Sequence, residues 1–356
     1  MVYISYSLVK FLNCRNLMAL GESKQRRKEL NMQLLRKTIL GVSALAISAS
    51  ITTAGYAADV RVAFFLEWAT PNQIAKVEKT YDDAMGVNLK WTNFDTGVNM
   101  TEAMLAGDID ISYSQGLTPF ANAVNAKAPI KMVAIAVAYG AADDCIVRND
   151  AGISKSNASE LEGKKVAVPL NTMADFGFRM TMKAVGVDVN ELKVVDMAPE
   201  DGAVALIDGQ VTMACAYGAN SLTKMKTVGK PMLTSAAKKA AGITSFDIIS
   251  VTDKFAQENP ALVRTFIDVT HKANAAFAKD QSKIGVIAKD AGMTVEKTKS
   301  QMSGFVFPTV DEQMRDYFSK NGLARKMTAF MGKMFATASN PALKDYNATI
   351  DTSFLK

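Results

Sequence analysis

The segment ISYSQGLTPF, residues 111–120, decides the fold, because within it a strand ends where a helix begins. The apolar run stops at Gly116, and Thr118-Pro119 predicts a helix start with Thr118 as the N-cap. A strand that runs directly into a helix leaves free backbone N–H groups and the positive end of a helix dipole at one place. We therefore expect an anion to bind here, through Gly116, Leu117 and Thr118.

A second corner of the same kind lies in the segment KVAVPLNTM, residues 165–173. A short strand ends in this segment, and the pattern predicts a helix over residues 175–185. Asn171, Thr172 and Met173 would then supply the anion donors of a second half. Such residues can also be plain helix caps, but both corners lie where strands end, which is where open α/β sheets bind ligands. We expect the two corners to face one site.

Strand and helix patterns alternate in two successive series, which predicts an α/β protein with two lobes. Segments 103–111 and 205–213 share one order of features: the end of a helix, a glycine and then a strand. The last third of the chain is almost wholly helical. Apolar spacing predicts single helices over residues 73–85 and 313–335 and a long helix that begins at Pro260. One face of that long helix should be buried, and it carries Val263, Phe266, Ile267, Thr270, Asn274 and Phe277.

The basic charge of the chain is confined to its first 58 residues. The formal net charge is +6, yet residues 1–58 hold eight of the 41 Lys and Arg side chains and two of the 35 Asp and Glu side chains. That leaves 33 of each sign in residues 59–356. Because the body of the chain carries no net charge, we expect no nucleic-acid partner.

Residues 32–58 have the composition of a cleavable secretory signal peptide. Arg36 and Lys37 precede an apolar stretch without charges, and small residues then lead through Ala57 and Ala58. Such a signal would direct the protein to the periplasm and be cleaved after one of these two alanines.

An uncleaved membrane anchor is the alternative for this segment, but the apolar stretch falls short of the roughly 20 strongly apolar residues that a membrane span needs. Residues 1–31 precede the signal without an evident purpose. We expect them to be a non-native extension, with synthesis starting at Met32.

Export would leave two cysteines, Cys145 and Cys215, and an oxidising compartment permits one disulfide between them. Two separate buried thiols are the alternative. His271 is the only histidine of the chain, and no Cys-x-x-Cys motif occurs. These features argue against zinc sites and histidine-dependent nucleophilic catalysis, so we expect no metal and no cofactor.

Five segments resemble those of one family of transport proteins. They are KWTNFDTG (residues 90–97), AGDIDI (106–111), LTP (117–119), LEGKKVAVP (161–169) and Phe246-Asp247. Together with the order of signal peptide and lobes, they resemble periplasmic solute-binding proteins of ABC importers. The branch that binds taurine, aliphatic sulfonates and nitrate is the most similar, and within it the taurine-binding proteins. The segment YGAN, residues 217–220, stands where those proteins have an aromatic residue and a proline.

The resemblance implies the two-lobed periplasmic binding protein fold of type II, with two α/β lobes joined by crossing strands and a helical C-terminal region. It assigns residues 59–145 to the first part of lobe I, 146–246 to lobe II and 247–356 to the return to lobe I and the C-terminal helices. It also implies a monomer that captures a small zwitterionic or anionic sulfonate, in first place taurine. An ABC permease in the inner membrane would receive this ligand.

The ammonium of a zwitterionic sulfonate needs a carboxylate or aromatic faces. Asp247 lies in an otherwise apolar strand, where a carboxylate needs a partner. The resemblance implies that this partner is the ligand's amine, and an internal salt bridge is the alternative. Glu67 would serve in the same way or be solvated. Trp68, Tyr139 and Tyr217 would wall the pocket or pack in the core.

Other ligands stay open: an alkanesulfonate, isethionate, nitrate or a thiamine-pyrimidine precursor. The carboxylates of Asp247 and Glu67 argue against bare nitrate. Proteins of a related fold include cytosolic pyrimidine synthases that consume their own cofactor and histidine. The signal peptide and the position of His271 on a distant helix argue against such an enzyme, so we expect a binding protein.

Overall fold

The computed structural model describes residues 59–140, 142–243 and 245–355 of the 356-residue chain. The predictions about the N-terminal extension and the signal peptide, residues 1–58, lie outside the described residues. Within the part of the chain that is described, no helix is both long and apolar enough to span a membrane.

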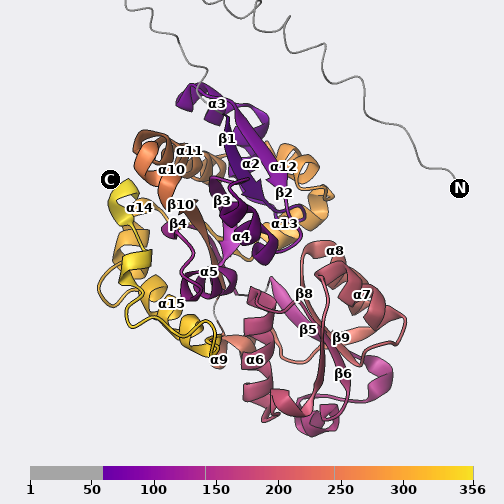
Figure 1. Cartoon of the computed structure of the whole chain (residues 1–356). Helices are drawn as coiled ribbons and strands as arrows, with labels where there is room; N and C mark the ends of the chain where they lie inside the picture. The colour runs from indigo at the N-terminus through magenta and orange to yellow at the C-terminus, as the bar shows by residue number, and fades with distance from the viewer. Residues whose placement is uncertain (1–58, 141, 244, 356) are drawn as a thin grey trace, which may run out of the picture. The chain divides into compact units, whose positions relative to one another are not determined.

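A six-stranded sheet in the order β11-β4-β10-β3-β1-β2 forms the centre of the first lobe (Figure 1). Strand β1 runs parallel to β2 and β3, whereas β10 runs antiparallel between β3 and β4. The strands span Val60–Phe64 (β1), Leu89–Asn93 (β2), Ile111–Gly116 (β3), Ile130–Tyr139 (β4), Ser245–Thr252 (β10) and Phe305–Val306 (β11). A late segment of the chain therefore lies at the centre of a sheet built mainly from early ones.

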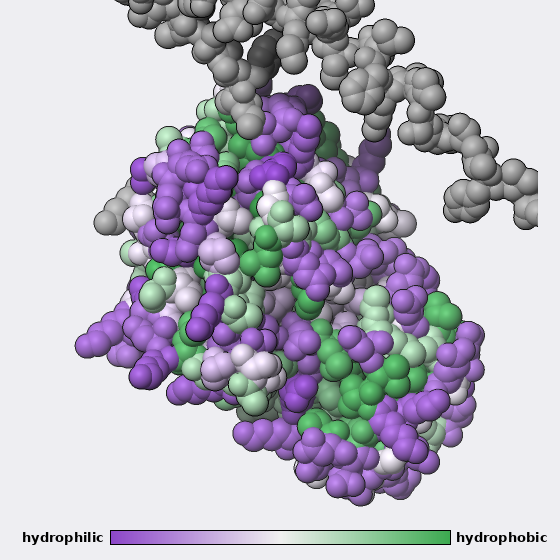
Figure 2. Space-filling view, in the orientation of Figure 1, coloured by the Kyte–Doolittle hydropathy of each residue, from purple (hydrophilic) through white to green (hydrophobic). Residues whose placement is uncertain are grey.

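A five-stranded sheet in the order β7-β6-β8-β5-β9 forms the second lobe. Helices α6 and α7 flank it in Figure 1, and Figure 2 shows hydrophobic residues gathered on one face of this lobe. The strands span Asp143–Arg148 (β5), Lys165–Val168 (β6), Lys193–Asp196 (β7), Met213–Tyr217 (β8) and Gly229–Pro231 (β9). The predicted α/β class with two lobes is confirmed. The boundaries expected after residues 145 and 246 stay predictions, and they fall inside β5 and β10.

Helices complete both lobes. They span Asn72–Val77 (α2), Thr80–Met85 (α3), Gly97–Ala106 (α4), Leu117–Asn125 (α5), Met173–Val185 (α6), Pro199–Ile207 (α7), Ala219–Lys226 (α8), Ser235–Ala240 (α9), Asp253–Glu258 (α10), Pro260–Lys279 (α11), Ile284–Asp290 (α12), Val295–Met302 (α13), Val310–Glu312 (α14) and Leu323–Met334 (α15). Single 3₁₀ turns or short 3₁₀ helices cover Asn149–Ala151, Lys155–Leu161, Val189–Glu191, Asn347–Thr349 and Thr352–Leu355, and a π-helical turn covers Gln313–Tyr317.

The long helix predicted from Pro260 is present as α11, and every residue expected on its apolar face is buried. Phe266 of this face stacks on Tyr81 of α3, with 4.7 Å between the ring centroids. The Tyr81 hydroxyl shares a 2.7 Å hydrogen bond with the Thr270 hydroxyl one helical turn further along α11. The polar tip of a buried tyrosine therefore has a partner, which lets the ring fill the core without an unsatisfied hydroxyl.

The prediction of single helices over residues 73–85 and 313–335 is wrong. Lys79 adopts a left-handed conformation (φ 57°) and separates α2 from α3. The break changes which side chains face inward, so Val77 is exposed and Met85 is buried. In the second case Gly322 precedes α15, and a Cβ atom there would lie 2.2 Å from the carbonyl oxygen of Tyr317. The first helical segment ends at Tyr317, and Gly322 permits the close backbone approach that separates it from α15.

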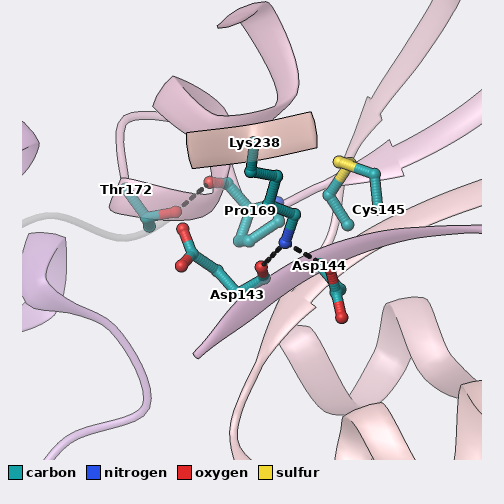
Figure 3. The surroundings of a disulfide bond; sticks show 7 residues. Asp143, Asp144, Cys145, Pro169, Thr172 and Lys238 are labelled. Carbon is teal, nitrogen blue, oxygen red and sulfur yellow. Dashed lines mark hydrogen bonds and ion pairs between the residues drawn. A yellow bond between two sulfur atoms is a disulfide. The ribbon is translucent and has the colours of Figure 1, made fainter. Parts of the chain in front are cut away.

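A disulfide joins Cys145 and Cys215, which lie directly opposite each other in the antiparallel pair β5–β8 (Figure 3). The bond closes a loop with a sequence separation of 70 residues. It ties the first strand of the second sheet to a strand that follows two further strands and two helices. This cross-link therefore constrains most of the second lobe.

Replacing both cysteines by serine should lower the free energy of unfolding by about 2–4 kcal/mol, because the unfolded chain regains the entropy that the loop closure removes. Urea denaturation of the wild type and of Cys145→Ser/Cys215→Ser measures the difference. A reductant should shift the wild-type transition and leave the double variant unchanged. Alkylation of two free thiols in the unreduced, unfolded body of the protein would contradict the bond.

Candidate functional site

A cavity of about 320 Å³ is lined by residues of both lobes. Eight of the residues predicted to bind a ligand line it: Glu67, Trp68, Gly116, Tyr139, Thr172, Met173, Tyr217 and Asp247. Leu117, Thr118 and Asn171 are not among the lining residues. The cavity therefore contains most of the predicted set, and it lies where strands β3, β4, β5, β8 and β10 begin or end.

At the first corner the predicted N-cap is wrong. Helix α5 starts at Leu117 with Gly116 as N-cap, and Thr118 is completely buried, with its hydroxyl 3.4 Å from the sulfur atoms of Met173 and Met331. A Cβ atom on Gly116 would lie 2.8 Å from Cγ of Met173, so the chain passes too close for a side chain. Within the described residues, the amides of Leu117 and Thr118 have no recorded hydrogen-bond partner. The corner thus offers no hydroxyl, and these two amides belong to residues that are fully buried and do not line the cavity.

The second corner is partly occupied by its own side chains. The amide of Asn171 donates to the Asp175 carboxylate at 2.9 Å, and the Thr172 hydroxyl donates to the carbonyl of Pro169 at 2.6 Å. Asn171 therefore does not offer the backbone donor predicted for it. The amides of Thr172 and Met173 lack a partner among the residues described. The carboxylate of Asp175, in the first turn of α6, already balances part of the positive helix end.

Asp247 is the buried polar centre of the cavity, with 4% of its surface exposed. It lies on the antiparallel strand β10, opposite Gly116 of β3 and Val137 of β4. One carboxylate oxygen accepts a 2.9 Å hydrogen bond from the Ser114 hydroxyl and the other a 2.8 Å bond from the Tyr139 hydroxyl. No ion pair with a described lysine or arginine includes Asp247, so the internal salt bridge considered as an alternative is not formed there.

Ser114, which sequence analysis did not select, aligns this carboxylate. Its φ of 65° is left-handed, and the pairing of β3 with β10 shifts by one residue beside it. The extra residue turns the Ser114 hydroxyl toward Asp247 while Trp68 donates its indole N–H to the same hydroxyl at 2.8 Å. A serine in an apolar strand has no sequence signal for such a bulge. The role of Ser114 emerges only from the backbone.

Aromatic rings form the wall next to Asp247. Trp68 packs edge-on against Tyr139 with 5.1 Å between centroids, and at 4.8 Å from Phe305 of β11. These rings form a small core cluster, and those of Trp68 and Tyr139 also line the cavity. These two residues therefore both pack in the core and wall the cavity. Tyr217 lies on the other lobe, and its hydroxyl donates to the carbonyl of Asp95 at 2.8 Å.

Burial raises the pKa of Asp247 to about 7, although the hydrogen bonds from Tyr139 and Ser114 stabilise its ionised form. The charge of Asp143, a second lining carboxylate, adds to this increase. Burial also raises the pKa of Tyr139 and of Tyr217, so both hydroxyls keep their protons. Near neutral pH, Asp247 is therefore poised between its two forms, and a cation placed in the cavity would favour the ionised one.

Glu67 connects the two lobes instead of being solvated. Its carboxylate accepts hydrogen bonds from the backbone and side-chain N–H groups of Asn220, and Lys297 donates to the side-chain oxygen of the same asparagine. Gly218 has φ 86°, and a Cβ atom on it would lie 3.2 Å from the Glu67 carboxylate. The segment YGAN, which departs from the aromatic–proline pair of the taurine-binding proteins, thus supplies the partner of Glu67.

The described residues contain no group of three His, Cys, Asp or Glu side chains placed to hold a metal ion. His271 contacts Gln313, with 2.9 Å between the two Nε2 atoms, and does not line the cavity. The chemistry of the cavity is therefore that of carboxylates, hydroxyls, aromatic faces and backbone amides.

The chain is similar to known proteins in sequence and in fold. The family model described as NMT1/THI5 like matches residues 72–284. The taurine-binding periplasmic protein of Escherichia coli (strain K12) is 23% identical over 276 residues, which cover 76% of this chain and 84% of that protein.

Two solved structures share the fold. The alkanesulfonate-binding protein SsuA from Xanthomonas axonopodis pv. citri, bound to MOPS, superposes with a TM-score of 0.68 at 15% identity, covering 84% of this chain and 100% of that one. The periplasmic aliphatic sulphonate binding protein SsuA from Escherichia coli gives a TM-score of 0.61 at 16% identity, covering 78% and 91%. The chain belongs to the NMT1/THI5-like family and has the fold of periplasmic binding proteins.

Proposed function

We propose that the protein is the periplasmic solute-binding component of an ABC importer and that it captures taurine or a similar small sulfonate between its lobes. The buried carboxylate of Asp247, in a cavity with aromatic walls, is the observation that carries this proposal. The similarity to binding proteins for taurine and aliphatic sulfonates supports it. The protein then acts as a monomer and passes its ligand to a permease in the inner membrane.

Each end of a zwitterionic sulfonate has a partner of suitable chemistry. The amides of Thr172 and Met173, which line the cavity at the second corner, are neutral donors for a sulfonate that stays ionised at every physiological pH. The ammonium pairs with Asp247. Hydrogen bonds between the lobes, such as that of Glu67 with Asn220, hold the cleft closed around the ligand.

Alkanesulfonates, isethionate, nitrate and a thiamine-pyrimidine precursor are the alternative ligands. The first three lack a positive group for Asp247, and its ionised carboxylate repels each of these anions. An enzyme of the pyrimidine-synthase type needs a histidine at its site, whereas His271 lies on α11 and lines a different groove. We therefore propose a binding role without catalysis.

Taurine should bind to the purified protein more tightly than isethionate, propanesulfonate or nitrate. Asp247→Asn should weaken taurine binding about 10- to 100-fold, because the ligand's ammonium loses its charged hydrogen-bond partner in a buried site. Each factor of ten in affinity corresponds to about 1.4 kcal/mol. Isothermal titration calorimetry measures both effects. Asp268→Asn is the matched control, since Asp268 is a solvent-exposed carboxylate of α11 paired with Lys272. If the wild type bound none of the sulfonates, the proposed function would be refuted.

Taurine affinity should rise with pH up to about pH 7 and then level off. An ammonium beside Asp247 favours the ionised carboxylate, so binding releases a proton wherever the free protein, with a pKa of about 7, still holds one. The slope is at most about tenfold per pH unit. Isethionate, which has no ammonium, should bind more weakly as pH rises through the same range. Calorimetry in buffers of different ionisation enthalpy counts the released protons, and an unchanged slope in Asp247→Asn would contradict this assignment.

A further inference from the structure

The charges that line the cavity all have one sign. Among the lining residues there is no lysine, arginine or histidine within the described chain. Acidic residues from both lobes line it: Glu67, Asp95, Asp143, Glu200, Asp201 and Asp247. A ligand that is only an anion would meet like charge on every side, whereas a positive group on the ligand would be attracted from both lobes. The strength of that attraction depends on which carboxylates lack a protein partner.

Asp143 is a carboxylate of the second lobe that lacks a side-chain partner and, unlike Asp201, is partly buried. It begins β5 and lies directly opposite Tyr217 in the β5–β8 pair, two residues before the disulfide partner Cys145. Because side chains alternate along a strand, Asp143 and Cys145 share one face of the sheet. The disulfide thus fixes the end of the strand pair that presents Asp143 and Tyr217 to the cavity.

Lys238 lies beside Asp143 but does not neutralise it. The Lys238 ammonium donates to the backbone carbonyl of Asp143 and forms its ion pair with the carboxylate of the next residue, Asp144. In Figure 3 the carboxyl group of Asp143 points away from Lys238 and toward Thr172. No hydrogen bond or ion pair joins that carboxylate to any other described side chain. Asp143 is thus held in place by its backbone, and its carboxylate is left for a ligand.

The two carboxylates of the cavity influence each other. Burial raises the pKa of Asp143 to about 6, and the nearby Lys238 limits that increase. The charge of Asp143 in turn raises the pKa of Asp247. Two like charges in a half-buried cavity without a cation are unfavourable, so a positive group between them stabilises both. Asp247 and Asp143 come from different lobes, so the same group would also draw the lobes together.

We infer that Asp143 and Asp247 together hold the ligand's positive group, and that the cleft selects a primary ammonium. This inference rests on the proposed function. A primary ammonium has three N–H donors in a tetrahedral arrangement, so it can donate to carboxylates on opposite sides at once. Asp143 is then the residue by which the second lobe distinguishes an aminosulfonate from an alkanesulfonate.

An aromatic cage would select differently. Trp68 and Tyr139 could also attract a cation through their ring faces, and such sites favour fully methylated amines. Each methyl group on the nitrogen removes an N–H donor and keeps the positive charge. A series of N-methylated taurines therefore separates recognition by two carboxylates from recognition by aromatic faces.

The test is calorimetric titration of the purified protein with taurine, N-methyltaurine, N,N-dimethyltaurine and N,N,N-trimethyltaurine. Three proteins are compared: the wild type, Asp143→Asn and Asp208→Asn. Asp208 is the matched control, because it is an exposed carboxylate of the same lobe, at the end of α7, and does not line the cavity. Its replacement changes the net charge of the protein by the same amount as the replacement of Asp143. Thermal unfolding of each variant monitors its folding.

The wild type should lose at least tenfold in affinity from taurine to the trimethyl compound. Asp143→Asn should weaken taurine binding at least tenfold and flatten the methylation series, while Asp208→Asn changes taurine affinity less than twofold. Equal effects of the two variants would reduce Asp143 to a contributor to net charge and overturn the inference, as would preference for the trimethyl compound. If Asp143→Asn bound taurine as tightly as the wild type, the inference would be wrong and the proposed function would still stand. If the wild type bound none of these compounds, both the inference and the proposed function would be refuted.

Discussion

The burial of one carboxylate, that of Asp247, is the constraint on which the site depends. A carboxylate that is 96% removed from solvent needs hydrogen bonds, and Ser114 and Tyr139 provide them from the strands on either side of β10. Neither group carries a positive charge, so the ionised form of Asp247 is only partly compensated. The protein keeps an unfavourable charge at its centre, and a cationic ligand group relieves it.

The fold brings this carboxylate to the ligand through one topological feature. Strand β10 runs antiparallel to both of its neighbours in a sheet whose other central pairs are parallel. The chain reaches β10 only after completing the second sheet, so Asp247 lies where the chain has returned to the first lobe. Asp143 occupies the corresponding place on the way out, at the start of β5. The two carboxylates thus mark the two points at which the chain changes lobes.

Sequence patterns predicted the elements of regular periodicity and missed those set by single residues of unusual backbone conformation. The apolar face of α11 was predictable because its spacing of three and four is sustained from Val263 to Phe277, about four turns. The break at Lys79 was not, since a lysine in a left-handed conformation has no signature in composition or spacing. Gly322 is a different case, because a glycine in the sequence can signal a close backbone approach. The sequence does not show, however, that the group it approaches is the carbonyl of Tyr317.

The site shows the same division. Asp247 and the aromatic residues were predictable from the burial expected of an apolar strand and from the resemblance to a family. Ser114 could not be found, because the bulge that turns it toward Asp247 belongs to the pairing of two strands far apart in the sequence. The role of Asp143 could not be predicted, because the sequence does not show which of the two adjacent aspartates, Asp143 or Asp144, forms the ion pair with Lys238. Thr118 has the right residue type for an N-cap, but the N-cap is Gly116, two residues earlier.

The most direct test of the central claim is a pH titration of the aspartate carboxyl groups by carbon-13 NMR, with and without saturating taurine. Asp247→Asn identifies the resonance of Asp247. The account predicts a midpoint near 7 for the free protein and a midpoint lower by about 1–3 pH units with taurine bound, because the ammonium stabilises the carboxylate. A midpoint that taurine leaves unchanged would show that the buried carboxylate does not hold the ligand's positive group.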